Sequence, residues 1–132
     1  MANYVSYDKE NNILFADYTN QTLTTAIFDQ ILREVRTLVA QLPQKVYFLA
    51  CLKNTKTAPE LQMVWGQYSV EMMQYVKGIV RYEANDTVTN IAIRSSTVRY
   101  HVQGINSHIY PSREAALAAI RQMEQMEQNE KA

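Results

Sequence analysis

Apolar and polar positions alternate in short blocks along the chain, and three of these blocks predict β-strands. Residues 4–7 and 13–18 are β-rich apolar runs on either side of a polar turn, the pattern of a hairpin. Residues 46–52 are apolar throughout and lie between a proline and a polar loop. A continuous run of that kind is typical of a strand covered on both faces, so we expect it at the centre of a sheet.

Two longer segments have the period of an amphipathic helix. From Leu23 to Leu42 apolar residues recur every three or four positions, with Thr22 or Thr24 as the expected cap. A second helix is predicted from Pro59 to residue 77, because proline suits the first turn of a helix and an apolar stripe follows it.

The last third of the chain predicts two more strands and two more helices. Strands are expected at 79–82 and 107–110, and a helix capped by Ser112 is expected to run to residue 123. Residues 86–103 fit a helix that begins at Asp86 and ends near Gly104, although their alternation also fits two strands; we favour the helix.

These elements together predict a single α/β domain over residues 1–123, followed by a polar tail, 124–132, that frays. The order is β-β-α-β-α-β-α-β-α. Strands that alternate with helices indicate one mixed sheet of about five strands, covered by about four helices.

Composition narrows the class of protein. The chain has 132 residues, and its 13 basic and 13 acidic residues balance, so we expect no nucleic-acid partner. Its single cysteine, Cys51, excludes an internal disulfide, and the start of the chain has no signal-peptide pattern. No apolar run is long enough to span a bilayer. We therefore expect a cytoplasmic protein with no membrane span.

Three segments resemble a known family. Residues 46–54 are similar to the central strand and small loop of STAS-like domains, the group that contains the anti-sigma-factor antagonists and bacterial proteins of uncertain role. Residues 57–61 resemble the start of the helix after that loop, and 109–117 resemble the closing strand, capped turn and alanine-leucine helix. The resemblance implies a STAS-like fold and a regulatory role through protein contacts.

The resemblance also implies where regulation would occur. In the antagonists the central strand ends with an aspartate, and a partner kinase phosphorylates a serine that starts the next helix. Cys51 stands at the aspartate position here, and Thr57, with Thr55 close by, is the hydroxyl nearest to the phospho-acceptor position. An ordinary cap or loop hydroxyl is the alternative interpretation of Thr57, and we favour it. The candidate regulatory loop consists of Lys53, Asn54, Thr55, Lys56, Thr57 and Glu60.

The second predicted helix carries more large, adaptable side chains than a core stripe needs. Such side chains recur where proteins bind partners or apolar ligands. The core interpretation accounts for Trp65, Tyr68 and Met72, whereas the other three would form a surface patch if they are exposed. The candidate ligand or partner patch consists of Met63, Trp65, Tyr68, Met72, Met73 and Tyr75.

Three functions remain open at this stage, and each predicts a different feature. A non-enzymatic interaction module with an unknown protein partner, our first expectation, needs a closed core and an exposed surface around the regulatory loop. A binder of a small apolar, lipid-like ligand needs a cavity lined by Trp65, Tyr68 and Met72. An enzyme, which we do not expect, needs two ionisable groups that converge in a cleft. We expect no metal, since His101 and His108 lack metal-site spacing, and no cofactor, while a homodimer is compatible with the pattern.

Overall fold

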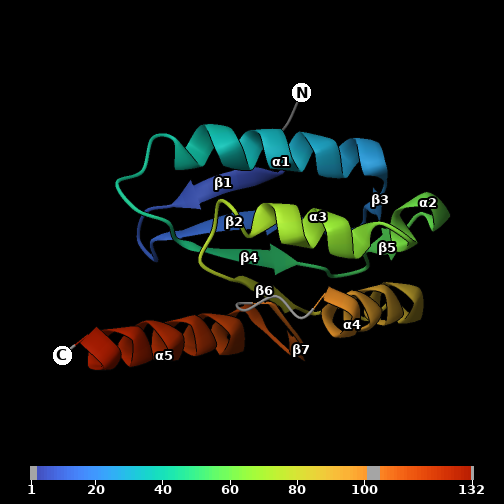
Figure 1. Ribbon diagram of the computed structural model, residues 1–132. Coiled ribbons are helices and arrows are strands. Elements are labelled where there is room, and N and C mark those ends of the chain that lie inside the picture. Colours follow the sequence, from blue (N-terminus) through green and yellow to red (C-terminus); the bar gives the residue numbers. More distant parts are fainter. Residues whose placement is uncertain (1–2, 101–104, 132) are drawn as a thin grey trace.

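The molecule is built around one mixed sheet, seen in the computed structural model, which describes residues 3–100 and 105–131 (Figure 1). Its strands are β1 (Val5–Asp8), β2 (Ile13–Asp17), β4 (Tyr47–Cys51), β6 (Ile79–Tyr82) and β7 (Ile105–Tyr110). They lie in the order β1-β2-β4-β6-β7. β1 is antiparallel to β2, and the other neighbours are parallel. The predicted mixed sheet of about five strands is therefore confirmed.

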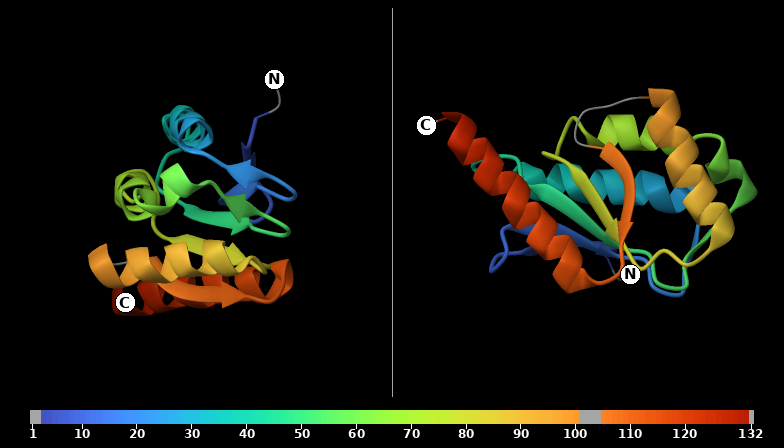
Figure 2. Two further views of the ribbon diagram at one scale, coloured as in Figure 1. Left: turned by 90° about the vertical axis from the view of Figure 1, so that its right-hand side faces the viewer. Right: turned by 90° about the horizontal axis from the view of Figure 1, so that it is seen from below.

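In the part of the chain that the structure describes, five helices connect or follow the strands, where about four were expected. They are α1 (Thr25–Val39), α2 (Pro59–Gln62), α3 (Trp65–Met72), α4 (Thr87–Tyr100) and α5 (Arg113–Lys131). Each parallel crossover steps to the next strand in the same direction, so the connecting helices share one face of the sheet. Figure 2 shows α1, α3 and α4 on that face and α5 on the other.

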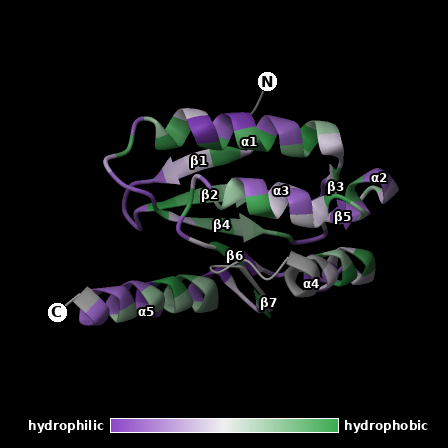
Figure 3. Ribbon diagram, in the orientation of Figure 1, coloured by the Kyte–Doolittle hydropathy of each residue, from purple (hydrophilic) through white to green (hydrophobic). Residues whose placement is uncertain are grey.

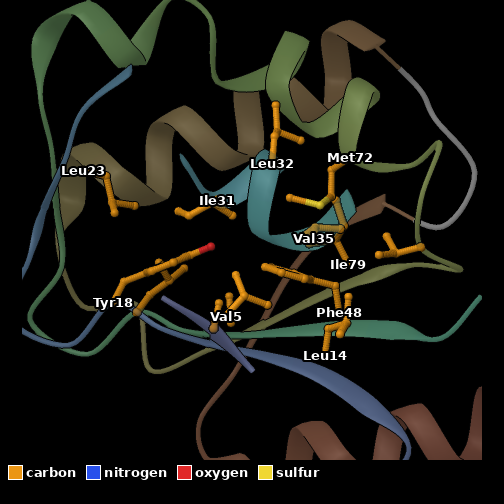
Figure 4. Close-up of a cluster of buried hydrophobic side chains, with 14 of the residues drawn as sticks. Val5, Leu14, Tyr18, Leu23, Ile31, Leu32, Val35, Phe48, Met72 and Ile79 are labelled. Atoms are coloured by element: carbon orange, nitrogen blue, oxygen red, sulfur yellow. The ribbon is translucent and has the colours of Figure 1, made fainter. Parts of the chain in front are cut away.

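The core divides into two layers because side chains on a strand alternate between the faces. On β4, Phe48 and Ala50 pack toward α1 and α3, whereas Leu49 packs toward α5. We call the first surface the three-helix face and the second the α5 face. Figure 3 shows the apolar residues of β2 and β4, together with the apolar positions that recur along α1. Figure 4 shows the core of the three-helix face, with the Tyr18 hydroxyl directed into it.

The segment expected to be one helix from Pro59 to residue 77 is two shorter helices. α2 ends at Gln62, and α3 runs only from Trp65 to Met72. The prediction of a single helix was wrong, because the helix is interrupted at residues 63–64 while the apolar stripe continues past that point. The stripe indicates which side chains are buried, but it does not show that the helix is continuous.

Residues 86–103 contain the helix that we favoured over two strands. α4 runs from Thr87 to Tyr100, and Asp86 caps it by accepting a hydrogen bond from the Thr89 backbone N–H at 2.9 Å. His101 and Gly104, which the sequence placed at the end of this helix, lie outside the described residues.

A short second sheet was not predicted. β3 (Thr22–Leu23) pairs in parallel with β5 (Lys56–Thr57), with Leu23 opposite Thr57. Thr24 follows β3 and caps α1, accepting from the Ile27 N–H at 3.2 Å. The regulatory loop is therefore partly a strand.

The polar tail predicted to fray is helical, so the boundary at residue 123 was wrong. α5 continues to Lys131, and Glu127 accepts hydrogen bonds from the Tyr47 hydroxyl at 2.6 Å and from Lys77 Nζ at 2.9 Å. These contacts hold the last turns of the helix against the sheet. Within the described ranges, none of the helices has the length and apolarity that a bilayer span requires.

Candidate functional site

A small cavity of about 40 Å³ lies between the sheet and helices α1 and α3. Its walls come from β4, β6, both helices and the residues that follow β2 and β4, and they are mostly apolar or aromatic. The lining residues are Tyr18, Phe28, Ile31, Leu32, Phe48, Ala50, Leu52, Trp65, Tyr68, Ser69, Met72, Ile79 and Arg81. The cavity lined by Trp65, Tyr68 and Met72, which the ligand-binding hypothesis predicted, is present.

Arg81 brings a positive charge into this apolar cavity. It lies in the middle of β6, where alternation turns Arg81 toward the three-helix face and Val80 toward the α5 face. The residue is only 4% exposed, and its Nη2 donates to Ser69 Oγ at 3.5 Å. Burial lowers the pKa of Arg81 to about 10, while the nearby Tyr18 raises it. Arg81 therefore remains charged at neutral pH.

Trp65 supplies a second polar group in the cavity. It begins α3 and is 2% exposed. Among the described residues, its indole Nε1 is a buried side-chain donor without a hydrogen-bond partner. A buried donor without a partner lowers the stability of the folded state by about 1–3 kcal/mol. Most buried donors are therefore hydrogen-bonded to protein, water or a ligand.

Two half-buried aromatic residues close the outer side of the cavity. Phe28 on α1 and Tyr68 on α3 are the only lining residues that are more than marginally exposed, among side chains that the structure describes. Their rings meet edge to face with centroids 5.4 Å apart. The Tyr68 hydroxyl donates to Asp29 at 2.7 Å, and this hydrogen bond raises the pKa of Tyr68 to about 12. The Tyr68–Asp29 bond therefore links α3 to α1 across the mouth.

The six residues of the candidate ligand or partner patch do not share one surface. Trp65 and Met72 are buried, and Tyr68 is half-buried at the mouth of the cavity. Met63 is 71% exposed, but Met73 and Tyr75 are half-buried and pack against the core. The surface patch was conditional on the exposure of all three, and only Met63 meets that condition.

The two threonines of the regulatory loop are buried. Thr55 is 0% exposed, and its hydroxyl donates to the Tyr18 carbonyl at 2.8 Å. Thr57 is 7% exposed, and its hydroxyl shares a 2.7 Å hydrogen bond with that of Thr89 on α4. Their burial shields both hydroxyls from a kinase in this conformation.

The remaining residues of the loop are exposed, and Lys53 lines a second hollow. Asn54 and Asn85 join the loop to the start of α4 through two reciprocal hydrogen bonds, of 3.1 and 3.3 Å. An open cleft of about 820 Å³ lies beside them, at the carboxyl ends of the parallel strands. Its lining residues are Lys53, Glu83, Ala84, Asn85, Asn90, Arg94, His108, Ile109, Tyr110 and Pro111.

Ionisable side chains in the cleft meet only part of what an enzyme needs. Lys53, Glu83, Arg94 and His108 all line it. General acid–base chemistry also requires two such groups within hydrogen-bond reach of one substrate atom. The four side chains share the lining of one open cleft, which does not by itself bring two of them within reach of one substrate atom.

Arg81 is the site residue that sequence reasoning missed, although a signal for it was present. The run Ile79-Val80-Arg81-Tyr82 was identified as a strand between two helices. A charged residue in the middle of a strand covered on both faces must be buried. That conflict between residue type and position was the available signal.

Comparisons with protein-family models, with curated proteins and with solved structures give no match. The proposals that follow therefore depend on the geometry of the chain and on the sequence resemblance described above.

Proposed function

We propose that this chain is a non-enzymatic protein that binds a small ligand in the cavity between the sheet and helices α1 and α3. The observation that carries the proposal is the lining of that cavity. It combines aromatic and aliphatic walls with a buried cation, Arg81, and a buried donor, Trp65 Nε1. A ligand site usually combines an apolar pocket with a small number of polar groups that converge on the ligand.

The size of the cavity limits what it holds. A volume of about 40 Å³ has room for about three water-sized groups, at roughly 10–15 Å³ each. A larger molecule fits only if part of it extends outward between Phe28 and Tyr68, the half-buried residues at the mouth. We therefore expect a ligand of few atoms, or one end of a longer apolar molecule.

Native mass spectrometry of the protein purified from its own cells tests this function. We expect an adduct on the native protein that is absent after denaturation. Ala50→Leu places a larger side chain in the cavity and should remove the adduct. Ala26→Leu is the matched control, because Ala26 is exposed on α1 and should leave the adduct in place. An adduct-free native mass, or equal adducts in both variants, would contradict the proposal.

A second function is supported by the exposed part of the regulatory loop. Lys53, Asn54, Lys56 and Glu60 are all exposed, and Lys53 lines the large cleft. Together with the resemblance to the STAS-like antagonists, this exposure supports an interaction module whose protein partner contacts the loop. Such a partner would contact the exposed residues of the folded loop rather than Thr55 and Thr57, which are buried beneath them.

Charge reversal at the loop separates this function from the first. Lys53→Glu with Lys56→Glu should abolish capture of one partner from the organism's own lysate. Lys9→Glu with Lys45→Glu, on exposed lysines outside the loop, should leave capture unchanged. Equal capture by both double variants would exclude the loop as the contact surface.

A further inference from the structure

We infer that the ligand is a small neutral carbonyl compound, whose oxygen accepts a hydrogen bond from Trp65 Nε1. The inference rests on the proposed ligand-binding function and specifies its chemistry. It follows from the unpartnered indole donor, from the hydrogen bonds that other polar groups of the lining already make, and from the volume and mouth of the cavity.

The indole of Trp65 requires an acceptor. Within residues 3–100 and 105–131, Nε1 is a buried side-chain donor without a hydrogen-bond partner, and the residue is only 2% exposed. An indole N–H only donates, so its partner must accept. Because the residue is buried, that partner has to lie inside the fold, and the cavity is the space that Trp65 lines. Ammonium groups, which only donate, are excluded from this position.

Three other polar groups of the lining already have partners. Ser69 donates its hydroxyl hydrogen to the Trp65 carbonyl at 3.1 Å, and Tyr68 donates its own to Asp29 at 2.7 Å. Arg81 is likewise engaged in the fold, with Ser69 among its partners. A ligand that accepts from the indole N–H leaves the bonds of Ser69 and Arg81 in place.

These bonds favour a neutral oxygen over a charged one. A buried carboxylate is stable only where a cation or several strong hydrogen bonds compensate for its charge. Among the described residues that line the cavity, Arg81 is the basic one, and it already has partners. A carbonyl oxygen accepts a hydrogen bond without bringing a charge, and it carries no hydrogen of its own that the cavity would have to satisfy.

The volume and the mouth fit a carbonyl group with a short apolar body. About 40 Å³ accommodates about three water-sized groups, which corresponds to a carbonyl carbon, its oxygen and one methyl group. Phe28 packs against Trp65 with ring centroids 4.9 Å apart and against Tyr68 at 5.4 Å. The rest of the ligand would lie along these rings, between α1 and α3. Entry by this path requires Tyr68 to release its hydrogen bond to Asp29.

Three probes of nearly the same shape separate the head groups. Butanone carries the carbonyl, and 2-methyl-1-butene has a methylene group in place of the oxygen. Propionate has a charged second oxygen in place of the methyl group of butanone. Ligand-detected NMR titration at neutral pH measures the affinity of each. We expect saturable binding of butanone and at least about tenfold weaker binding of propionate.

The chain contains a reporter for the hydrogen bond itself. Trp65 is its single tryptophan, so the isotope-labelled protein has one indole N–H resonance. A hydrogen bond to a carbonyl moves such a proton resonance downfield. We expect the resonance to lie further downfield with butanone than with 2-methyl-1-butene, which offers no comparable acceptor. This comparison uses the unchanged protein, so it decides the question even where a variant fails to fold.

One substitution assigns the preference to Trp65. Trp65→Phe removes the donor and keeps an apolar ring. The two neutral probes differ in hydration, but that difference cancels when the ratio of their affinities is compared between protein variants. Trp65→Phe should lower the ratio of butanone affinity to 2-methyl-1-butene affinity by about fivefold, the equivalent of one ordinary hydrogen bond. Tyr7→Phe is the matched control, since it also removes a polar hydrogen from an aromatic ring, lies outside the lining and should leave the ratio unchanged.

The outcomes separate this inference from the proposed function. A ratio that survives Trp65→Phe in a folded protein, or one position of the indole resonance with both neutral probes, would overturn the carbonyl inference and leave an apolar-ligand cavity in place. Propionate that binds as tightly as butanone would overturn the neutral class. No saturable binding of any probe would contradict the inference and the proposed function together.

Discussion

The two faces of the central sheet place their polar groups differently. On the α5 face the polar side chains lie at the rim, where the Tyr47 hydroxyl and Lys77 meet Glu127 and Arg113 pairs with Asp8 at 3.1 Å. On the three-helix face, Arg81 and Trp65 Nε1 lie inside the apolar layer beside a cavity. Under the proposed function, the α5 face serves stability alone, whereas the three-helix face combines part of the core with a ligand site.

The largest expected effect comes from a matched pair of truncations, one on each face. Ile120 on α5 and Ile31 on α1 are each 1% exposed, and only Ile31 lines the cavity. Each change to alanine should lower the free energy of unfolding by about 3 kcal/mol, because buried methylenes are lost. Urea unfolding measures this loss.

The same pair should differ in ligand binding. Ile31→Ala enlarges the cavity, so a bulkier apolar ligand should bind more tightly than it does to the unchanged protein. Ile120→Ala leaves the cavity intact, and the adduct seen by native mass spectrometry should be the same as before. If Ile120→Ala altered the adduct as strongly as Ile31→Ala, the functional division between the faces would be refuted.

A second pair tests whether the three-helix face is hollow only beside Arg81. Ala16 and Ala50 are register neighbours on β2 and β4, and both are buried on this face. Only Ala50 lines the cavity. Ala16→Val should overpack a closed region and destabilise the fold by about 2 kcal/mol, while Ala50→Val should cost less than about 0.5 kcal/mol. Equal losses in thermal unfolding would mean that the cavity does not relieve the added volume.

Elements with a regular apolar period were predictable from the sequence. The strands at 79–82 and 46–52 and the helix beginning near Thr24 follow from alternation, continuous apolarity and capping. Each depends on neighbours in the sequence, and the structure places all of them close to their expected positions.

Features that depend on distant segments were not predictable. Residues 22–23 form a strand only because residues 56–57 pair with them, and the final turns of α5 are fixed by Tyr47 and Lys77. The cavity likewise requires α1, α3 and β6 to converge on Arg81. A pattern along one chain segment contains no information about which segments meet.

The end of α5 provides a third, smaller test. Removing residues 124–132 deletes Glu127 and exposes the Tyr47 side chain, which is 6% exposed in the intact chain. We expect the truncated protein to lose about 1 kcal/mol of unfolding free energy, the usual value of one hydrogen bond together with the lost cover. Glu127→Gln in the full chain keeps an acceptor for Tyr47 and should lose less. An unchanged unfolding midpoint after truncation would show that residues 124–132 are a dispensable tail.

The smallest expected effect concerns the ion pair at the start of α5. Asp8 Oδ2 accepts from Arg113 at 3.1 Å and from the Asn11 side chain at 2.8 Å. The Asn11 hydrogen bonds, aided by the charge of Arg113, hold the pKa of Asp8 below its ordinary value of 3.8. Because the folded state lowers this pKa, the stabilisation is present above about pH 4 and is lost as the pH falls through the folded value.

Asp8→Asn should therefore lower the unfolding free energy by about 0.5 kcal/mol at neutral pH, since pairs that are partly exposed contribute little. The difference from the unchanged protein should shrink as the pH falls from about 4 through the folded pKa of Asp8, below which Asp8 is protonated in both states. Glu10→Gln, an exposed acid in the same turn, is the control and should show no such convergence. A loss that stayed constant down to acidic pH would mean that the Asp8 side chain contributes through packing rather than through its charge. The rim of the α5 face would then hold its helix without electrostatic help, and the contrast with the buried charge at Arg81 would be sharper still.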